Sequence, residues 1–575
     1  MPRIHSLMYL SDMRCDDSRK RIVALAHIEL IASHFDLERS VSELIPFLYE
    51  FREDSEEVLL QFCEALEVLA KFIKRKRGDI SDLVPLFEVV LISEDRSVAE
   101  IGINKLIQIT RVTRFNSLFD LVQKLLEHGS DMAVVSAIRI CCRLINSIPE
   151  RRYDQIEQIL ENLSHSPRLF VRAELAKELQ VLILEAGTLE RVSTEILRKL
   201  TNDPQEAVLV AAVQSWCNVS VSKPYFFANV FPILKSQINS PSWRVRYTIA
   251  CGFPSIIAKA FPSENSSEII QHIIKYIQDE EIEVAIKTIE VLKSIFQYIA
   301  QKEFEVFLPA FQSILENQHF DIRHEIATSL PSIASGELGT SSEIYLSILE
   351  TLLKDSRPEI PMQLFENFEP IWNKFHKNNL RAMIKPILIN LLSNESWTIR
   401  QQAVVCLDKI TQKLGESFAS DAQIVSSFKS RLSDNVFKVR NDTILLLKSL
   451  STHFGRDYAE KVVLPIFQEF QNHKNYLFRI NYLKGISSLA QLFSLKALLA
   501  EVQTVKRLCF DKVPNVRQQS LATLTELYLN GNNSLLEETV KEVIEKLEDD
   551  LDQQVQHQRN HLIGSIKESI NYDDF

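Results

Sequence analysis

One apolar position recurs along the whole chain. It returns fifteen times, at steps of 36 to 40 residues. A period of this length is typical of stacked helix pairs, in which each unit buries its apolar face only against its neighbours. The pattern therefore predicts an elongated helical repeat and favours a binding surface over an enclosed active site. The position, named V below, is occupied by Ile22, Val58, Val98, Val134, Val171, Val208, Val245, Val284, Ile322, Ile360, Ile399, Val439, Phe478, Val516 and Val555.

The residues around V predict the second helix of each pair. Positions V, V+4 and V+8 span about 80° of a helix, which makes them a buried stripe. Five residues before V, thirteen of the fifteen units carry Asp, Asn, Ser or Gly, and we interpret this residue as the helix N-cap. Position V+8 is occupied by Leu30, Leu66, Leu106, Cys142, Leu179, Trp216, Phe253, Leu292, Leu330, Phe368, Leu407, Leu447, Ile486, Leu524 and Ile563.

Two further features recur within the repeat. Prolines 12 or 13 residues before V predict that several first helices are kinked at the same height. Arginine follows V directly in seven units, and acidic residues recur at V−5. These residues could form a ladder of ion pairs between neighbouring units, or they could simply be exposed to solvent, and the sequence leaves both interpretations open. The prolines are Pro46, Pro85, Pro232, Pro309, Pro386 and Pro465, and the arginines are Arg172, Arg246, Arg323, Arg400, Arg440, Arg479 and Arg517.

Charge and composition exclude several classes of function. A net charge of −11 over 575 residues argues against a nucleic-acid partner, because such binding is driven by basic surface. The eight cysteines contain no CxxC pair and are read as reduced core thiols. With neither a signal peptide nor a membrane span in the sequence, we expect a cytoplasmic or nuclear protein with no membrane partner.

No catalytic constellation is found. The sequence holds no P-loop, no nucleophile elbow and no dinucleotide fingerprint, so it predicts a protein that is not an enzyme and has no cofactor, metal or small-molecule substrate. His557 and His561 lie four apart but lack a third ligand, and we interpret them as surface imidazoles. The basic cluster at 74–77 is interpreted as a solvated loop, with an import signal as the alternative.

Aromatic residues recur at V−2, in the first turn of the second helix. They are Trp243, Trp397, Phe437 and Tyr476, and the last three belong to consecutive units. Exposed aromatic side chains offer large contact area at low entropic cost, which suits a protein-binding hot spot. Packing against the adjacent turn is the alternative.

The period, the prolines and the Val-Arg pairs resemble HEAT repeats, which implies an all-α, two-layer α-solenoid of about fifteen repeats. More specifically, the sequence resembles the scaffold (A, structural regulatory) subunit family of protein phosphatase 2A. The segments that carry this resemblance are LERSVSELIPFL at 37–48, EEVLL at 56–60, SWRVRY at 242–247, LGESF at 414–418, FGRDYA at 454–459, NYLFR at 475–479 and PNVR at 514–517.

The resemblance implies a non-catalytic scaffold with two protein partners. Repeats one to eight (7–300) would bind an exchangeable regulatory B-type subunit, repeats nine and ten (301–375) would form the middle, and repeats eleven to fifteen (376–575) would bind the phosphatase catalytic subunit. The implied regulatory-subunit contacts are Glu94, Asp95, Arg172, Ser242 and Trp243. The implied catalytic-subunit contacts are Trp397, Phe437, Tyr476, Arg479, Val513 and Asn515.

The sequence departs from the family pattern at several of these positions. Asp131 and Met132 replace an expected Trp-Phe pair, and Ala173 replaces the second arginine of a pair. Ser396 and Thr398 flank Trp397 where the family has basic residues, and Phe437 occupies a position where the family has tyrosine. These departures affect which partners bind. A karyopherin-like receptor is the alternative function, and a HEAT-like DNA glycosylase is a third that needs a basic concave face.

Overall fold

The computed structural model describes residues 8–110, 115–185, 187, 189–222, 227–260, 266–299, 301–316, 319–335, 342–530 and 533–572. Its contacts divide the chain into two compact units, Met1–Tyr298 (unit 1) and Ile299–Phe575 (unit 2). The described residues form helices and no β-strand. The predicted all-α class is confirmed.

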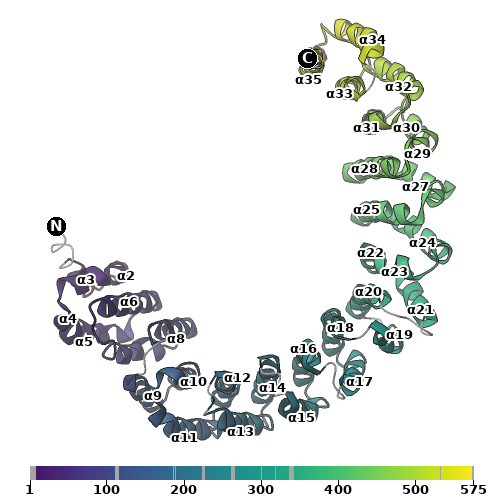
Figure 1. Ribbon diagram of the computed structural model, residues 1–575. Helices are drawn as coiled ribbons and strands as arrows, with labels where there is room; N and C mark the ends of the chain where they lie inside the picture. The colour runs from purple at the N-terminus through teal and green to yellow at the C-terminus, as the bar shows by residue number, and fades with distance from the viewer. Residues whose placement is uncertain are drawn as a thin grey trace. The chain divides into compact units, whose positions relative to one another are not determined.

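In unit 1 the second helices of the repeats contact one another in chain order and form one layer (Figure 1). This layer contains α2 (Ser18–Ala26), continued by α3 (Ile28–His34), then α6 (Glu56–Arg75), α8 (Arg96–Thr110), α10 (Asp131–Arg143), α12 (Leu169–Glu185), α14 (Glu206–Ser222), α16 (Trp243–Ala260) and α18 (Ile282–Phe296). The first helices form the other layer: α4 (Leu37–Arg39), α5 (Ile45–Leu48), α7 (Glu88–Leu91), α9 (Asn116–His128), α11 (Tyr153–Ser164), α13 (Glu190–Leu200), α15 (Phe227–Gln237) and α17 (Ser266–Ile277).

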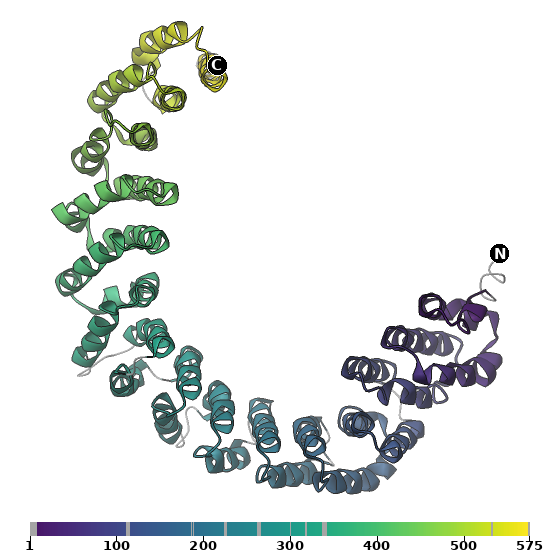
Figure 2. The ribbon, with the colours of Figure 1, turned by 180° about the vertical axis from the view of Figure 1, so that it is seen from behind.

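Unit 2 repeats this arrangement, and the view from behind shows the same two layers within it (Figure 2). Its second-helix layer contains α20 (Phe320–Ala334), α22 (Glu359–Glu366), α23 (Glu369–Lys374), α25 (Trp397–Leu414), α28 (Phe437–Phe454), α31 (Tyr476–Leu489), α33 (Pro514–Asn530) and α35 (Gln553–Tyr572). Its first helices are α19 (Leu308–Ile314), α21 (Ser342–Leu353), α24 (Lys377–Leu392), α27 (Ala422–Leu432), α30 (Leu464–Gln468), α32 (Leu495–Leu508) and α34 (Asn533–Lys546), with the short α26 (Glu416–Ala419) and α29 (Arg456–Tyr458) before two of them.

The predicted apolar stripe forms the core between the layers. Thirteen of the fifteen V residues are buried, and so are thirteen of the fifteen at V+8. Burying one such side chain stabilises the fold by roughly 1.5–3 kcal/mol. Each repeat therefore depends on its neighbours for stability, as a solenoid requires.

The register predicted for the first repeat is wrong by two residues. Ile22 is half-buried and Leu30 is 45% exposed, whereas Ala24 and Ile28 are fully buried. The guanidinium of Arg21 donates to the carbonyl of Cys15, six residues before it, as the V+1 arginines of later repeats do. By this contact the position equivalent to V is Lys20, which is exposed, and the buried stripe of this repeat begins at Ala24.

The predicted N-caps are also displaced by two residues. The V−5 side chain accepts a hydrogen bond from the amide at V−3, before the helix begins: Asp434 Oδ1 accepts from Val436 N at 3.0 Å, and α28 begins at Phe437. The cap position is thus V−3, while V−5 forms the preceding turn. Asn317, the V−5 residue of the ninth repeat, lies outside the described residues.

Helical backbone continues through the prolines of the first helices, but its hydrogen-bond pattern changes beside most of them. Pro46, Pro309 and Pro465 stand within the first two residues of α5, α19 and α30, and Pro85 lies in a short 3₁₀ segment before α7. A π-helical turn precedes Pro46 and Pro465, which relieves the clash between the proline ring and the carbonyl four residues earlier. Of these six prolines, Pro232 and Pro386 lie in the interior of single α-helices, α15 and α24.

The ladder interpretation of the V+1 arginines is confirmed. Six of the seven arginines pair with the V−5 aspartate of the next repeat at 2.6–2.8 Å, and both side chains of each pair are largely buried. Each pair therefore joins two successive repeats. The pairs are Arg172–Asp203, Arg246–Asp279, Arg323–Asp355, Arg400–Asp434, Arg479–Asp511 and Arg517–Asp550, and Arg21–Asp54 is a seventh pair at the start of unit 1.

Candidate protein-binding surface

The aromatic residues at V−2 begin their helices. Trp243, Trp397, Phe437 and Tyr476 are the first residues of α16, α25, α28 and α31, which confirms their predicted place. Trp397 is 46% exposed and Phe437 is 57% exposed, while Trp243 and Tyr476 are half-buried. Because α25, α28 and α31 contact one another in order, Trp397, Phe437 and Tyr476 form a row at matching ends of three adjacent helices, called the aromatic row below.

The other residues implied as catalytic-subunit contacts differ in whether they are available to a partner. Asn515 is exposed in the first turn of α33, and Val513 is half-buried just before it. Arg479 is buried, and it donates to Asp511 and to the carbonyl of His473 as a member of the ladder. Its role in binding stays a prediction, and the structure gives its guanidinium a partner within the chain.

The implied regulatory-subunit contacts all lie in unit 1. Trp243 has the guanidinium of Arg244 over its ring at 4.8 Å, and Arg244 pairs with Glu206. The hydroxyl of Ser242 donates to the same glutamate at 2.5 Å. This contact holds the start of α16 against α14. Trp243 therefore lies in a charged, hydrogen-bonded setting, unlike the more open Trp397.

Two of the three remaining implied contacts of unit 1, Asp95 and Arg172, have partners within the chain. Asp95 precedes α8 and accepts from the hydroxyl and amide of Ser97, which lowers its pKa, and its charge raises the pKa of Glu56. Glu94 beside it is exposed. Arg172 pairs with Asp203, and this hydrogen bonding raises the pKa of Arg172. Glu94 is thus the carboxylate of this set most available to a partner.

The departures from the family pattern have local explanations. Asp131 pairs with Arg168 of the next repeat at 3.1 Å, so a charge pair stands where the family carries two aromatic residues. The hydroxyls of Ser396 and Thr398 lie 2.7 Å apart and bond to each other beside Trp397. Neither change buries Trp397.

The basic cluster at 74–77 is only partly a loop. Lys74 and Arg75 belong to the last turn of α6, where Lys74 donates to the carbonyl of Ile109 and Arg75 pairs with Glu29. The predicted loop is therefore wrong for these two residues.

A groove beside the aromatic row was not foreseen from the sequence, because amide side chains leave no periodic apolar signal. Its volume is about 430 Å³, it opens to solvent, and it crosses α28, α31, α33 and α35. We call it the amide groove; its lining residues are Phe437, Arg440, Leu477, Ile480, Asn481, Lys484, Asn515, Gln518, Gln519, Ala522, Gln554 and Gln558. It joins two residues of the implied catalytic-subunit surface, Phe437 and Asn515.

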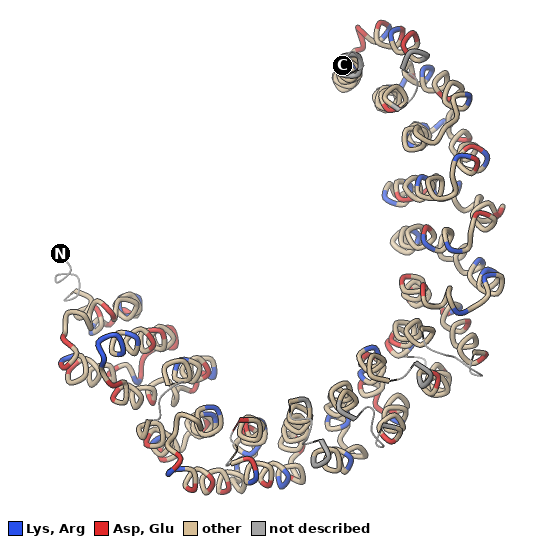
Figure 3. The backbone as a smooth tube through the Cα atoms, viewed as in Figure 1, with Lys and Arg blue, Asp and Glu red and all other residues tan. Residues whose placement is uncertain are grey.

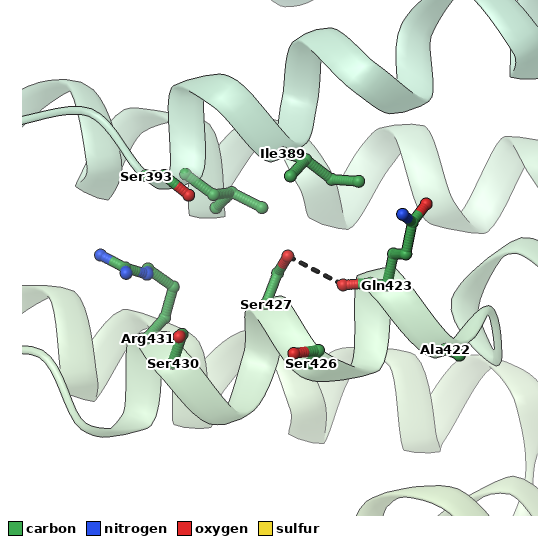
Figure 4. A pocket seen from close by; sticks show the side chains of 9 residues that line it. Ile389, Ser393, Ala422, Gln423, Ser426, Ser427, Ser430 and Arg431 are labelled. Atoms are coloured by element: carbon green, nitrogen blue, oxygen red, sulfur yellow. Dashed lines mark hydrogen bonds between the residues drawn. The ribbon is translucent and has the colours of Figure 1, made fainter.

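A second pocket, of about 350 Å³, lies between the first helices α24 and α27 (Figure 4). Serine side chains line it, and the hydroxyl of Ser427 donates to the carbonyl of Gln423. Its one cation, Arg431, is already paired with Asp434. None of the implied contact residues lies in this pocket.

The described part of the chain shows no feature of an enclosed reactive site. Acidic and basic residues are interspersed along both units (Figure 3). Burial raises the pKa of the Cys63, Cys141 and Cys217 thiols to about 12, so these cysteines are poor nucleophiles at neutral pH. No group of three metal-ligating side chains gathers among the described residues, and none of their helices is long and apolar enough to cross a bilayer.

Comparisons with known proteins agree with this geometry. A family model described as HEAT repeat matches residues 384–414. Over 290 residues the chain is 27% identical to the regulatory A subunit of protein phosphatase PP2A from Saccharomyces cerevisiae, covering 46% of this chain and 45% of that protein. Its counterpart of the same name from Schizosaccharomyces pombe is 24% identical over 263 residues, which covers 44% of this chain and 45% of that protein. The chain thus matches less than half the length of these relatives.

Solved structures share the fold. Kap121p bound to Ste12p superposes with a TM-score of 0.52 at 13% identity, covering 98% of this chain and 69% of that one. The Kap95:Nup1 complex gives 0.52 at 12% identity, covering 98% and 76%. At these identities the likeness concerns the fold alone. The chain is therefore an all-α solenoid of HEAT repeats. Within that class, its sequence is similar to the regulatory A subunits of protein phosphatase 2A.

Proposed function

We propose that this chain is a non-catalytic scaffold of a serine/threonine phosphatase of the 2A type. In this proposal the aromatic row of unit 2 binds the catalytic subunit, and the turns of unit 1 that carry Glu94 and Trp243, before α8 and at the start of α16, bind a regulatory B-type subunit. The similarity to A subunits supports the scaffold role. We also propose that the protein acts in the cytoplasm or the nucleus.

One observation carries the proposal: Trp397 and Phe437 stand exposed at the first positions of two adjacent helices. Two large aromatic groups exposed in register on adjacent helices offer the contact area of a protein-binding hot spot. The scaffold would act by positioning its two partner subunits near each other. Holding a catalytic and a substrate-recruiting subunit on one body raises the effective concentration of substrate at the catalytic site.

The test is the affinity of the full chain for a 2A-type catalytic subunit. Trp397→Ala should weaken binding by about 2 kcal/mol, close to 30-fold in Kd, because a hot-spot indole is lost. The matched control is Leu495→Ala, which removes a side chain of similar exposure (49%) from the first-helix layer and should leave the Kd unchanged. Equal affinity of wild type and Trp397→Ala would overturn the assignment of the aromatic row.

A karyopherin-like receptor is the second candidate, because the fold is shared with karyopherins. The two functions differ in their partner. A pull-down that offers a small GTPase and a phosphatase catalytic subunit together should retain the phosphatase if the scaffold proposal holds. Selective retention of the GTPase would favour the receptor.

A further inference from the structure

The amide groove of unit 2 is lined by basic side chains but by no acidic ones. Two basic residues, Arg440 and Lys484, line it, and no Asp or Glu does. The four helices that the groove crosses, α28, α31, α33 and α35, hold eight Lys or Arg against three Asp or Glu, in a chain whose net charge is −11. Two of these cations, Arg479 and Arg517, are paired with aspartates of the ladder. A groove of this kind is complementary to an anion.

Arg440 is the one V+1 arginine of the predicted ladder that lacks a carboxylate in the described structure. It is 5% exposed, and its Nη1 donates to the carbonyls of Asp434 and Asn435 at 2.7 and 3.1 Å. Its Nε is buried and has no hydrogen-bond partner among the described residues. A buried guanidinium with an unused donor is costly unless an anion satisfies it.

The cause of this difference lies in the next repeat. At the V−5 position, where the other ladder partners are aspartates, the chain has His473. Its Nδ1 accepts from the amide of Asn475 at 3.0 Å, so the ring replaces the aspartate in the turn but supplies no negative charge. The repeat geometry is retained without the carboxylate that would neutralise Arg440.

Lys484 lies at the same end of the groove. Its Nζ is 5.0 Å from the centre of the Phe437 ring, and it forms no ion pair within the described residues. The ring lies beside both cations, since Arg440 approaches it at 5.8 Å. An anionic group with an apolar neighbour would therefore meet two positive charges and an exposed phenyl ring together.

The rest of the groove is lined by side-chain amides. Asn515, Gln518, Gln519, Gln554 and Gln558 make no side-chain hydrogen bond to the described residues, and Asn481 uses its Nδ2 on the carbonyl of Leu432 at 2.9 Å. An amide side chain offers a donor and an acceptor together, which is what the main chain of an extended peptide requires. This lining suits a peptide backbone better than a compact inorganic ion.

We propose that the amide groove binds an extended acidic segment of a protein partner. A carboxylate of the segment pairs with Arg440 and Lys484, an apolar side chain beside it packs on Phe437, and the side-chain amides hold the segment's backbone. The inference goes beyond the proposed function, because it holds for any partner with such a segment. Nucleic acid is a poorer fit, since two cations supply little of the charge neutralisation that drives its binding.

The test is fluorescence anisotropy with the full chain and a fluorescein-labelled octapeptide of alternating leucine and glutamate. The same peptide with glutamine for glutamate should bind about tenfold more weakly, because the charge-assisted contact is lost. Lys484→Gln and Arg440→Gln should each weaken the glutamate peptide by a similar factor. Lys448→Gln, an exposed lysine of α28 outside the groove, is the matched control and should have no effect.

His473→Asp keeps the proposal falsifiable if Arg440→Gln fails to fold. The new carboxylate should pair with Arg440 inside the chain and so weaken the glutamate peptide, while the fold is retained. Equal binding of the two peptides, full affinity in both Lys484→Gln and His473→Asp, or displacement of the peptide by oligothymidylate at equimolar concentration would overturn the proposal. Trp397→Ala lies outside the groove and should bind the peptide normally, which separates this test from that of the phosphatase scaffold.

Discussion

Arg400 of one repeat holds Asp434 of the next through two hydrogen bonds, from Nε to Oδ2 at 2.7 Å and from Nη2 to Oδ1 at 2.9 Å. Arg431 donates to the same aspartate at 2.7 Å. The carboxylate thus joins the second helix α25 to the turn before α28. Since α25 and α28 begin with Trp397 and Phe437, this pair also fixes the spacing of the aromatic row.

We expect Asp434→Asn to loosen the α25–α28 junction more than Arg400→Met does. The first change leaves two largely buried guanidiniums without their carboxylate, while the second leaves Asp434 paired with Arg431. Removing one partner of a buried pair costs about 3 kcal/mol, and Arg400→Met should cost less. Hydrogen exchange read by mass spectrometry measures this as lost protection in α25 and α28. Lys409→Met, an exposed change on α25, is the control. Unchanged protection in Asp434→Asn would show that the ladder is not needed for this junction.

The ladder makes stability fall in acid. Hydrogen bonds from Arg517 hold the pKa of Asp550 below its usual value, and burial opposes this only in part. A carboxyl with a lowered folded pKa contributes stability above its unfolded pKa, about 3.9, and loses it as pH falls through the folded pKa. The Tm difference between wild type and Asp550→Asn should therefore be constant above about pH 5 and shrink below about pH 4. A difference that stays constant down to about pH 2 would contradict the pairing.

His473→Asp should stabilise unit 2. The new carboxylate would complete the ladder by accepting from Arg440, and its other oxygen would accept from the amide of Asn475, as the histidine ring now does. We expect a gain of about 1 kcal/mol and a higher Tm in thermal unfolding. Lys474→Asp makes the neighbouring exposed residue acidic and should give no gain. Equal effects of the two variants would mean that net charge, not the ladder, sets the result.

Gly485 permits the close approach of α31 to the first helix of its repeat. A methyl group at this position would lie within 3.0 Å of the Phe467 ring, well inside van der Waals contact. Gly485→Ala should therefore cost about 1–3 kcal/mol by overpacking, despite the better helix propensity of alanine. Gly564→Ala, in α35 with nothing within 4 Å, should be neutral or slightly stabilising in the same thermal assay. A stabilised Gly485→Ala variant would contradict this packing.

Much of the fold follows from the sequence because burial at V and V+8 imposes a long period. Residues such as Val439 and Leu447 satisfy it and are buried. The first repeat was misplaced because Ile22 and Leu30 match the period in type, whereas Arg21 and its contact with Cys15 set the true register. The prolines carry only part of the signal. Sequence indicates a bend at Pro46 and Pro465, and the structure adds a π-helical turn directly before each proline, which the sequence does not reveal.

The candidate site was predictable only in part. The place of Trp397 and Phe437 at V−2 follows from the repeat, but their exposure does not, because Trp243 and Tyr476 at the same position are half-buried. Arg479 resembles a contact residue in sequence, yet it is buried on Asp511, and only three-dimensional pairing reveals this. The amide groove left no signal, because glutamines such as Gln518 and Gln554 come from different repeats and meet only in the folded chain.

The most direct test of the scaffold proposal is affinity purification of the full chain from its native cells, with quantitative mass spectrometry of what accompanies it. The account predicts an equimolar serine/threonine phosphatase catalytic subunit, retained by wild type and depleted from the Trp397→Ala variant. Recovery of the chain without a phosphatase, or with a small GTPase as its stoichiometric partner, would contradict it.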